Sequence, residues 1–87
     1  KRLVTRAGEK VGLSPKEYAL LARLAMSPGK VLTQKELLVA VWGVSHAQDS
    51  QYLRVFIGQL RQKLETEPSH PRLILTEPGI GYRLAEP

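Results

Sequence analysis

Two arginines and three glutamines lie within residues 49–65 at spacings that place them on one side of a helix. Arginine and glutamine can make paired hydrogen bonds to guanine and adenine edges, and an apolar tip can contact a thymine methyl group. This side of the predicted helix comprises Gln51, Arg54, Val55, Gly58, Gln59, Arg61 and Gln62. Taken alone, the pattern favours a plain amphipathic helix with a polar outer face. The neighbouring segments must decide between this interpretation and a helix that contacts DNA bases.

The opposite side of the same helix is apolar. Its residues recur at three- and four-residue intervals and are Leu53, Phe56, Ile57, Leu60 and Leu64. Such a stripe packs on a core and turns the other side outward. Gly58 lies in the middle of that outward side, although a glycine there costs about 1 kcal/mol relative to alanine. Close approach of the helix backbone to a bulky partner is one reason for a glycine at this position.

Two earlier helices are marked by capping boxes, the S/T-x-x-E pattern at residues 14–17 and 33–36. They predict helices over residues 15–26 and 34–42. A polar linker over residues 44–48 then leads to the third helix. This order is a helix-turn-helix with a longer connection than the three or four residues of its simplest form.

A β-hairpin is predicted before the first helix, because apolar segments at residues 3–5 and 10–13 flank a turn that contains Gly8. Two strands of this length are marginally stable alone. We therefore expect them either to pack on the helices or to pair with strands upstream.

A second hairpin is predicted over residues 73–76 and 80–84, around a Pro-Gly pair that fits the centre of a type II turn. Ile80, Tyr82 and Leu84 are expected to share one face of its second strand. A helix-turn-helix followed by a hairpin is a winged helix.

The predicted fold class is therefore α+β: a winged helix-turn-helix with three helices, a C-terminal hairpin wing and a truncated N-terminal antiparallel sheet. The 87 residues are enough for one small domain, residues 1–87. Because the chain begins at Lys1 and not at methionine, we expect it to be part of a longer protein, without its upstream strands.

Composition narrows the functional class. The formal net charge of +5 and the pI of about 9.9 favour a polyanionic partner. The chain has no cysteine and no run of 18 apolar residues, which fits a reducing, cytoplasmic setting without a membrane span. No nucleophile–base pair or phosphate-binding glycine loop is apparent, so neither an enzyme nor a cofactor is predicted. His46 and His70 lie far apart in sequence without a further ligand at metal spacing, and no metal site is expected.

Five segments, taken in order, resemble the OmpR/PhoB class of response-regulator DNA-binding domains. They are SPKEYALL (residues 14–21), GKVLTQ (29–34), VWG (41–43), LRQKLE (60–65) and GIGYR (79–83). The resemblance spans almost the whole chain. It implies sequence-specific binding of double-stranded DNA with the third helix in the major groove, as the output domain of a two-component regulator. It also implies a phosphorylatable receiver domain elsewhere in the protein.

The resemblance also implies roles for individual residues. Base-edge candidates on the outward side of the third helix are Gln51, Arg54, Val55 and Gln59. Phosphate candidates are Thr33, Lys35, Tyr52, Arg61, Lys63, Thr76 and Tyr82. Members of the class often insert an arginine near the wing turn into the minor groove. Here the turn holds Glu77 and Pro78, so that insertion is not expected.

The linker after the second helix resembles a loop that some members use to contact RNA polymerase or DNA. Its candidates are Trp42, Val44 and His46, and RNA polymerase is a further candidate partner. Two of the candidate residues could serve the fold instead of a partner. Trp42 is of a type that favours packing inside the domain. Arg61 is as well suited to pair with Glu36 as with a phosphate.

The resemblance further implies direct-repeat operators bound by head-to-tail pairs, with the isolated domain a monomer in solution. The alternative is a winged-helix protein-interaction module without specific DNA binding. That role would favour an acidic or apolar face on the third helix, whereas this face carries arginines and glutamines.

Overall fold

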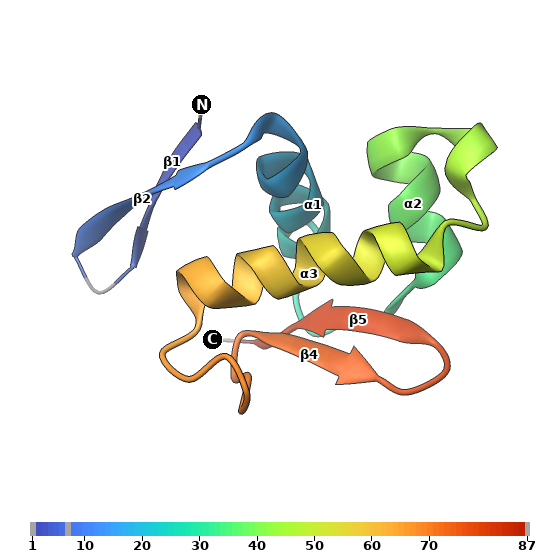
Figure 1. Ribbon diagram of the computed structural model, residues 1–87. Coiled ribbons are helices and arrows are strands. Elements are labelled where there is room, and N and C mark those ends of the chain that lie inside the picture. Colours follow the sequence, from blue (N-terminus) through green and yellow to red (C-terminus); the bar gives the residue numbers. More distant parts are fainter. Residues whose placement is uncertain (1, 7, 87) are drawn as a thin grey trace.

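The computed structural model describes residues 2–6 and 8–86. Three helices form the body of the chain, with a hairpin at one end and a three-stranded sheet beneath α3 (Figure 1). In chain order the elements are β1 (Arg2–Arg6), β2 (Glu9–Leu13), α1 (Pro15–Ala25), β3 (Leu32–Thr33), α2 (Gln34–Trp42), the 3₁₀ helix η1 (Val44–His46), α3 (Ser50–Leu64), β4 (Ile74–Glu77) and β5 (Gly81–Leu84). The three predicted helices and both predicted hairpins are confirmed.

Both capping boxes form as predicted. Ser14 Oγ accepts the Glu17 N–H at 3.3 Å, and the Glu17 carboxylate accepts the Ser14 N–H at 2.8 Å. Thr33 and Glu36 make the equivalent bonds at 3.0 and 2.8 Å. Gly43 ends α2 with a φ of +101°, a conformation that disfavours any residue with a Cβ.

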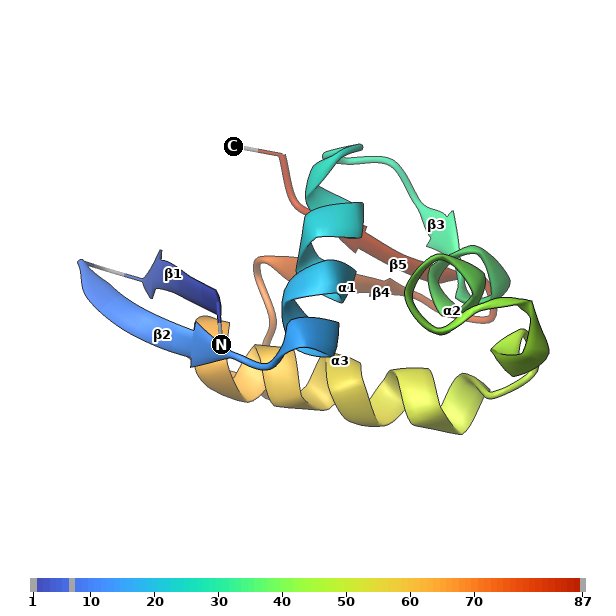
Figure 2. The same cartoon turned by 90° about the horizontal axis from the view of Figure 1, so that it is seen from above.

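The N-terminal hairpin pairs Arg6 with Glu9 around Gly8, whose φ is +85°. It extends from the helices on the side away from α2 (Figures 1 and 2). Leu13 is fully buried and Val11 packs against the same core. The end of β2 therefore packs on the helices, which is one of the two expected arrangements.

The helix α3 runs across both α1 and α2 and presents its apolar stripe to them (Figure 2). Leu53 and Leu60 are fully buried, Leu64 is nearly so, and Phe56 packs against the core at its edge. One cluster holds the buried apolar side chains: Leu13, Leu20, Leu24, Leu32, Leu37, Leu38, Val41, Leu53, Ile57, Leu60, Leu64, Ile74 and Tyr82. The predicted orientation of α3 is confirmed.

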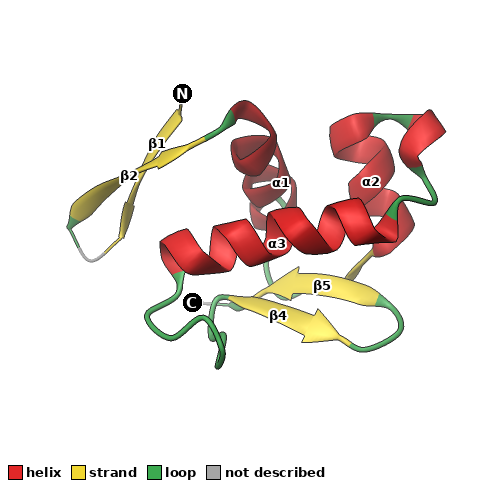
Figure 3. Cartoon of the chain, viewed as in Figure 1, coloured by secondary structure: helices red, strands yellow, loops and turns green. Residues whose placement is uncertain are grey.

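The wing is the hairpin of β4 and β5, which lies below α3 in Figure 3. Together with β3 it forms a three-stranded antiparallel sheet in the order β3–β5–β4. Gly81 of β5 lies so close to the Leu32 carbonyl of β3 that an added Cβ would overlap it. This close approach requires a glycine at position 81 and ties the wing to the start of α2.

The prediction that Ile80 belongs to the second strand and shares one of its faces with Tyr82 and Leu84 is wrong, since β5 begins at Gly81. The Glu77 carbonyl accepts the Ile80 N–H at 3.0 Å and closes the predicted turn, with Gly79 at a φ of +75°. Ile80 is thus the last residue of the turn and not a strand residue. Its side chain is 55% exposed, whereas that of Tyr82 is 7% exposed.

Candidate nucleic-acid interface

The side of α3 that faces away from the core, here called the outer face, is exposed along its length. Its members are Gln51, Arg54, Val55, Gly58, Gln59 and Gln62. All four base-edge candidates therefore lie on this face. No aspartate or glutamate occurs within α3, so nothing on the helix itself repels a phosphate backbone.

Two residues of the outer face are linked to each other. The Arg54 NH1 donates a hydrogen bond to the Gln51 Oε1 at 3.3 Å. The residues are three apart, a spacing that makes side chains neighbours on a helix. The spacing permits this pair, and its direction follows from chemistry, because a guanidinium only donates and the amide oxygen must accept. The structure shows that the bond is formed.

Gly58 lies one turn after Arg54 on the outer face. A Cβ added at this glycine would meet no atom within 4 Å. Packing within the described chain therefore does not require the glycine. Its effect is to leave the helix backbone open to approach from outside.

Arg61 connects α3 to the wing. Its Nε and NH2 donate to the Ile74 carbonyl at 3.1 and 2.8 Å, and NH2 also donates to the Thr76 hydroxyl at 2.7 Å. The guanidinium lies 5.8 Å from the centre of the Tyr82 ring. The considered pairing with Glu36 is not formed, because the Glu36 carboxylate instead caps α2. Arg61 thus fixes the position of β4 relative to the outer face.

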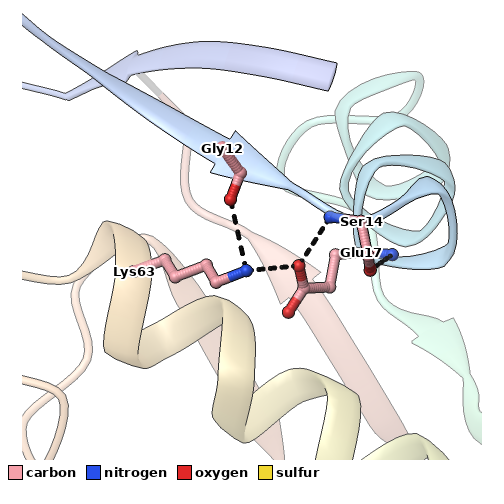
Figure 4. A network of polar contacts seen from close by, with 4 residues as sticks. All are labelled: Gly12, Ser14, Glu17 and Lys63. Carbon is pink, nitrogen blue, oxygen red and sulfur yellow. Dashed lines mark hydrogen bonds and ion pairs between the residues drawn. The ribbon is translucent and has the colours of Figure 1, made fainter. Parts of the chain in front are cut away.

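Lys63 lies on the side of α3 that faces α1 and β2. Its Nζ contacts the Glu17 carboxylate at 2.6 Å and the Gly12 carbonyl at 3.2 Å (Figure 4). Glu17 is 2% exposed and also accepts the Ser14 N–H. Its ammonium thus joins three elements inside the domain, and a phosphate contact at Lys63 stays a prediction.

The Glu17 carboxylate is stabilised in its charged form. Burial raises its pKa, but the hydrogen bonds from Lys63 and Ser14 and the charge of Lys63 outweigh burial and hold the pKa below its ordinary value. A carboxylate with a lowered pKa contributes stability above its unfolded-state pKa of about 4.3, and this contribution is lost as the pH falls through the folded-state pKa.

Lys63→Met should lower the free energy of unfolding at pH 7 by about 1–2 kcal/mol, a figure reduced because the Lys63 side chain is partly exposed. The difference from the parent chain should shrink as Glu17 becomes protonated at acid pH. Denaturant unfolding between pH 7 and pH 3 measures both effects. Lys10→Met removes the same charge from an exposed position and is the matched control. A Lys63→Met effect no larger than that of Lys10→Met would contradict the structural role.

An aromatic cluster lies between α2 and the beginning of α3. The Trp42 ring centre lies 5.2 Å from that of Tyr52 and 4.9 Å from that of Phe56. Trp42 thus packs against α3, as its residue type favours. Tyr52 remains 46% exposed, beside the outer face.

The linker between these helices is ordered as η1. His46 Nδ1 contacts the Asp49 carboxylate at 2.8 Å, and the His46 ring stacks on Tyr52. Val44 is 77% exposed. The linker therefore presents an apolar side chain next to the start of α3.

The remaining phosphate candidates lie outside α3, in α2 and the three-stranded sheet. Thr33 and Lys35, at the start of α2, are exposed. Thr76 is exposed in β4, whereas Tyr82 is mostly buried. At the wing turn, Glu77 forms an ion pair with Arg83 at 2.8 Å.

Two further features concern residues 2–6 and 8–86. Within these ranges no group of three or more His, Asp or Glu side chains is placed to hold a metal ion. Over the same residues, no helix is sufficiently long and apolar to cross a membrane.

Residues 8–84 match the family model described as "Transcriptional regulatory protein, C terminal". The KDP operon transcriptional regulatory protein KdpE of Escherichia coli (strain K12) is 52% identical over 82 residues, which are 94% of this chain and 36% of that protein. KdpE of Mycobacterium tuberculosis is 49% identical over 80 residues, 92% of this chain and 35% of that protein. The chain thus spans about a third of the length of these relatives. Within the class, Tyr52-Leu53-Arg54, Gly58 and residues 60–64 resemble the kdp regulator, and these relatives confirm that likeness.

Solved structures show the same fold. The Klebsiella pneumoniae RstA DNA-binding domain in complex with RstA box is 32% identical, with a TM-score of 0.86 over 97% of this chain and 83% of that chain. The Thermotoga maritima response regulator DrrB, an OmpR/PhoB homolog, is 32% identical, with a TM-score of 0.79 over 91% of this chain and 36% of that chain. The predicted winged-helix fold is confirmed by these similarities.

Proposed function

Because the chain belongs to the family of C-terminal domains of transcriptional regulatory proteins, in the OmpR/PhoB class, we propose that it binds double-stranded operator DNA sequence-specifically, as the output domain of a two-component response regulator. The observation that carries the proposal is the outer face of α3, which is exposed, free of carboxylates and occupied by arginine and glutamine. These side chains suit base edges in the major groove. The related RstA domain, solved in complex with RstA box, supports this mode of binding.

In this proposal Gln51, Arg54, Val55 and Gln59 contact base edges. Phosphate contacts come from exposed residues, among them Thr33, Lys35, Tyr52 and Thr76. Arg61, Lys63 and Tyr82 take a smaller part, since each is engaged within the domain. Glu77 at the wing turn pairs with Arg83. In this proposal the wing lies along the DNA phosphate backbone and does not enter the minor groove.

We also propose how the whole protein would use this domain. A receiver domain would control pairing of two such domains, head to tail, on direct-repeat operators in the cytoplasm, while the isolated domain stays monomeric. The linker with exposed Val44, together with Trp42 and His46, is a candidate contact for RNA polymerase. The family is one of transcription regulators and not of enzymes.

Arg54→Ala should weaken binding to the preferred operator by about 1–3 kcal/mol and relax the base preference at one base pair, because a bidentate contact to guanine is lost. The operator is first selected from random duplexes with the parent chain. Affinities are then measured for this operator and for a scrambled duplex at several salt concentrations.

Lys35→Ala is the matched control, since it removes one exposed charge that meets only phosphate in this proposal. It should weaken binding to both duplexes about equally and flatten the salt dependence by roughly one unit, from a log–log slope of about −4 to −5 for roughly five phosphate contacts. If Arg54→Ala also weakened binding to both duplexes equally, Arg54 would contact a phosphate. Base recognition would then have to come from Gln51, Val55 or Gln59. A parent slope near zero would contradict groove binding and favour the protein-interaction alternative.

A further inference from the structure

The hydrogen bond between Gln51 and Arg54 changes what Gln51 can offer to DNA. A free glutamine carboxamide presents one acceptor and one donor side by side, which matches the N6 amino group and N7 of adenine. In the structure the Gln51 Oε1 already accepts a hydrogen bond from Arg54 NH1 at 3.3 Å. With one lone pair of this oxygen engaged, the amide keeps two N–H donors and one acceptor site, and its match to adenine is weakened.

Arg54 keeps its fork of donors in this arrangement. A guanidinium carries five N–H groups, and Gln51 takes one of them through NH1. The residues one turn away from Arg54 on either side are Ser50, Gln51, Ile57 and Gly58. None of them is a carboxylate, so no neighbour on the same helix neutralises the guanidinium or turns it from the groove.

The pair therefore presents an excess of hydrogen-bond donors, the remaining N–H groups of Arg54 and the amide N–H groups of Gln51. Guanine offers two acceptors in the major groove, N7 and O6, whereas adenine offers N7 beside the N6 donor. A group of donors can bind both acceptors of guanine. At adenine, the same donors would face the N6 amino group, which is itself a donor. The pairing thus favours guanine both by attraction and by exclusion of the alternative.

Gln51 also restrains a long side chain before DNA arrives. An unrestrained arginine loses conformational freedom when it is fixed in an interface, and prior restraint reduces this loss. Both side chains are exposed on the outer face, so their pairing contributes little to folding and can be altered without loss of the core.

We propose that Gln51 is a positioning residue for Arg54: it directs the guanidinium to a guanine and excludes adenine at that base pair, and does not itself read adenine. This inference rests on the proposed function, because it concerns how the outer face of α3 selects its operator. It assigns one base preference to two residues acting as a unit.

The experiment compares Gln51→Ala, Gln51→Glu, Arg54→Ala and the Gln51→Ala/Arg54→Ala double variant. Each is tested on four duplexes that carry the selected operator and differ only at the base pair whose preference Arg54→Ala relaxes. The readout is the ratio of affinities for guanine over adenine at this position. Thermal unfolding of every variant checks that the fold is kept.

Gln51→Ala should reduce the guanine-to-adenine ratio roughly two- to tenfold, the size of one lost solvent-exposed hydrogen bond. Gln51→Glu should keep the hydrogen bond to Arg54, because a carboxylate accepts the same N–H, but it should still lower the guanine-to-adenine ratio, because a carboxylate has no N–H donor and can accept from the adenine N6 amino group. Its charge should also weaken binding to all four duplexes. In the Arg54→Ala background, Gln51→Ala should change the ratio no further, since it acts through Arg54. Gln62→Ala, an exposed glutamine on the same face, should leave the ratio unchanged.

Two results would overturn the inference while leaving the proposed function intact. In the first, Gln51→Ala abolishes a preference for adenine at another base pair and spares the guanine preference. In the second, Gln51→Ala has the same effect with and without Arg54. If the parent chain enriches no sequence from random duplexes, the proposed function itself fails, and the inference fails with it.

Discussion

Leu60→Ala should lower the free energy of unfolding by roughly 2–5 kcal/mol, the cost of lost apolar burial together with the cavity that remains. Leu60 is fully buried in the middle of the α3 stripe, where α3 crosses the other two helices. A domain of this size has a total stability of only about 5–15 kcal/mol. The substitution should therefore shift the midpoint of denaturant unfolding strongly and leave a marginally stable chain.

Gln59→Ala is the control for this prediction, since Gln59 precedes Leu60 on the same helix but lies on the outer face. Its effect on stability should stay within about 0.5 kcal/mol, while its effect on DNA binding is read separately. Equal stabilities for the two variants would mean that α3 presents the opposite side to the core.

Local signals account for what the sequence predicts well. Each capping box needs only two residues three positions apart, and both form with the expected bonds. The 3.6-residue period assigned Leu60 to the core and Gln59 to the surface, because burial on a helix follows from spacing alone. The outer face of α3, and thus the base-edge candidates, could be predicted for the same reason.

Contacts between distant elements could not be predicted in this way. Lys63 and Glu17 are 46 positions apart, and their pairing depends on how α3 crosses α1. The partners of Arg61 lie in β4, because the wing folds back beneath α3. The sequence does not show where β5 begins, because Ile80 is as apolar as a strand residue. The hydrogen bond from the Ile80 N–H to the Glu77 carbonyl keeps Ile80 in the turn, and the strand begins at Gly81.

Glu65 is the clearest example of a residue whose role depends on contacts with a distant segment. It appears in the sequence as one more charged residue at the end of a helix, yet its side chain is buried, with 3% exposed. Its carboxylate accepts the backbone N–H groups of Arg72, Leu73 and Ile74 at 2.8–3.1 Å. Glu65 thereby holds the start of β4 against the end of α3.

Glu65→Ala should therefore cost about 2–4 kcal/mol of unfolding free energy, because three backbone donors lose a charged acceptor and the Ile74 N–H is left unsatisfied in a buried position. Glu67→Ala is the matched control: it removes the same charge from an exposed loop position. It should change stability by no more than about 0.5 kcal/mol. Equal stability of the two variants would show that the bonds to Glu65 do not hold the wing.

DNA affinity gives a second, independent measure of the same contact. Either substitution raises the net charge by one, which alone should strengthen binding to any duplex. Glu65→Ala also releases β4, which carries Thr76 and the Ile74 carbonyl that holds Arg61. Where enough Glu65→Ala protein remains folded, it should bind the operator more weakly than Glu67→Ala, although both have the same charge. Equal operator affinities for the two variants would show that the wing position set by Glu65 makes no contribution to DNA binding.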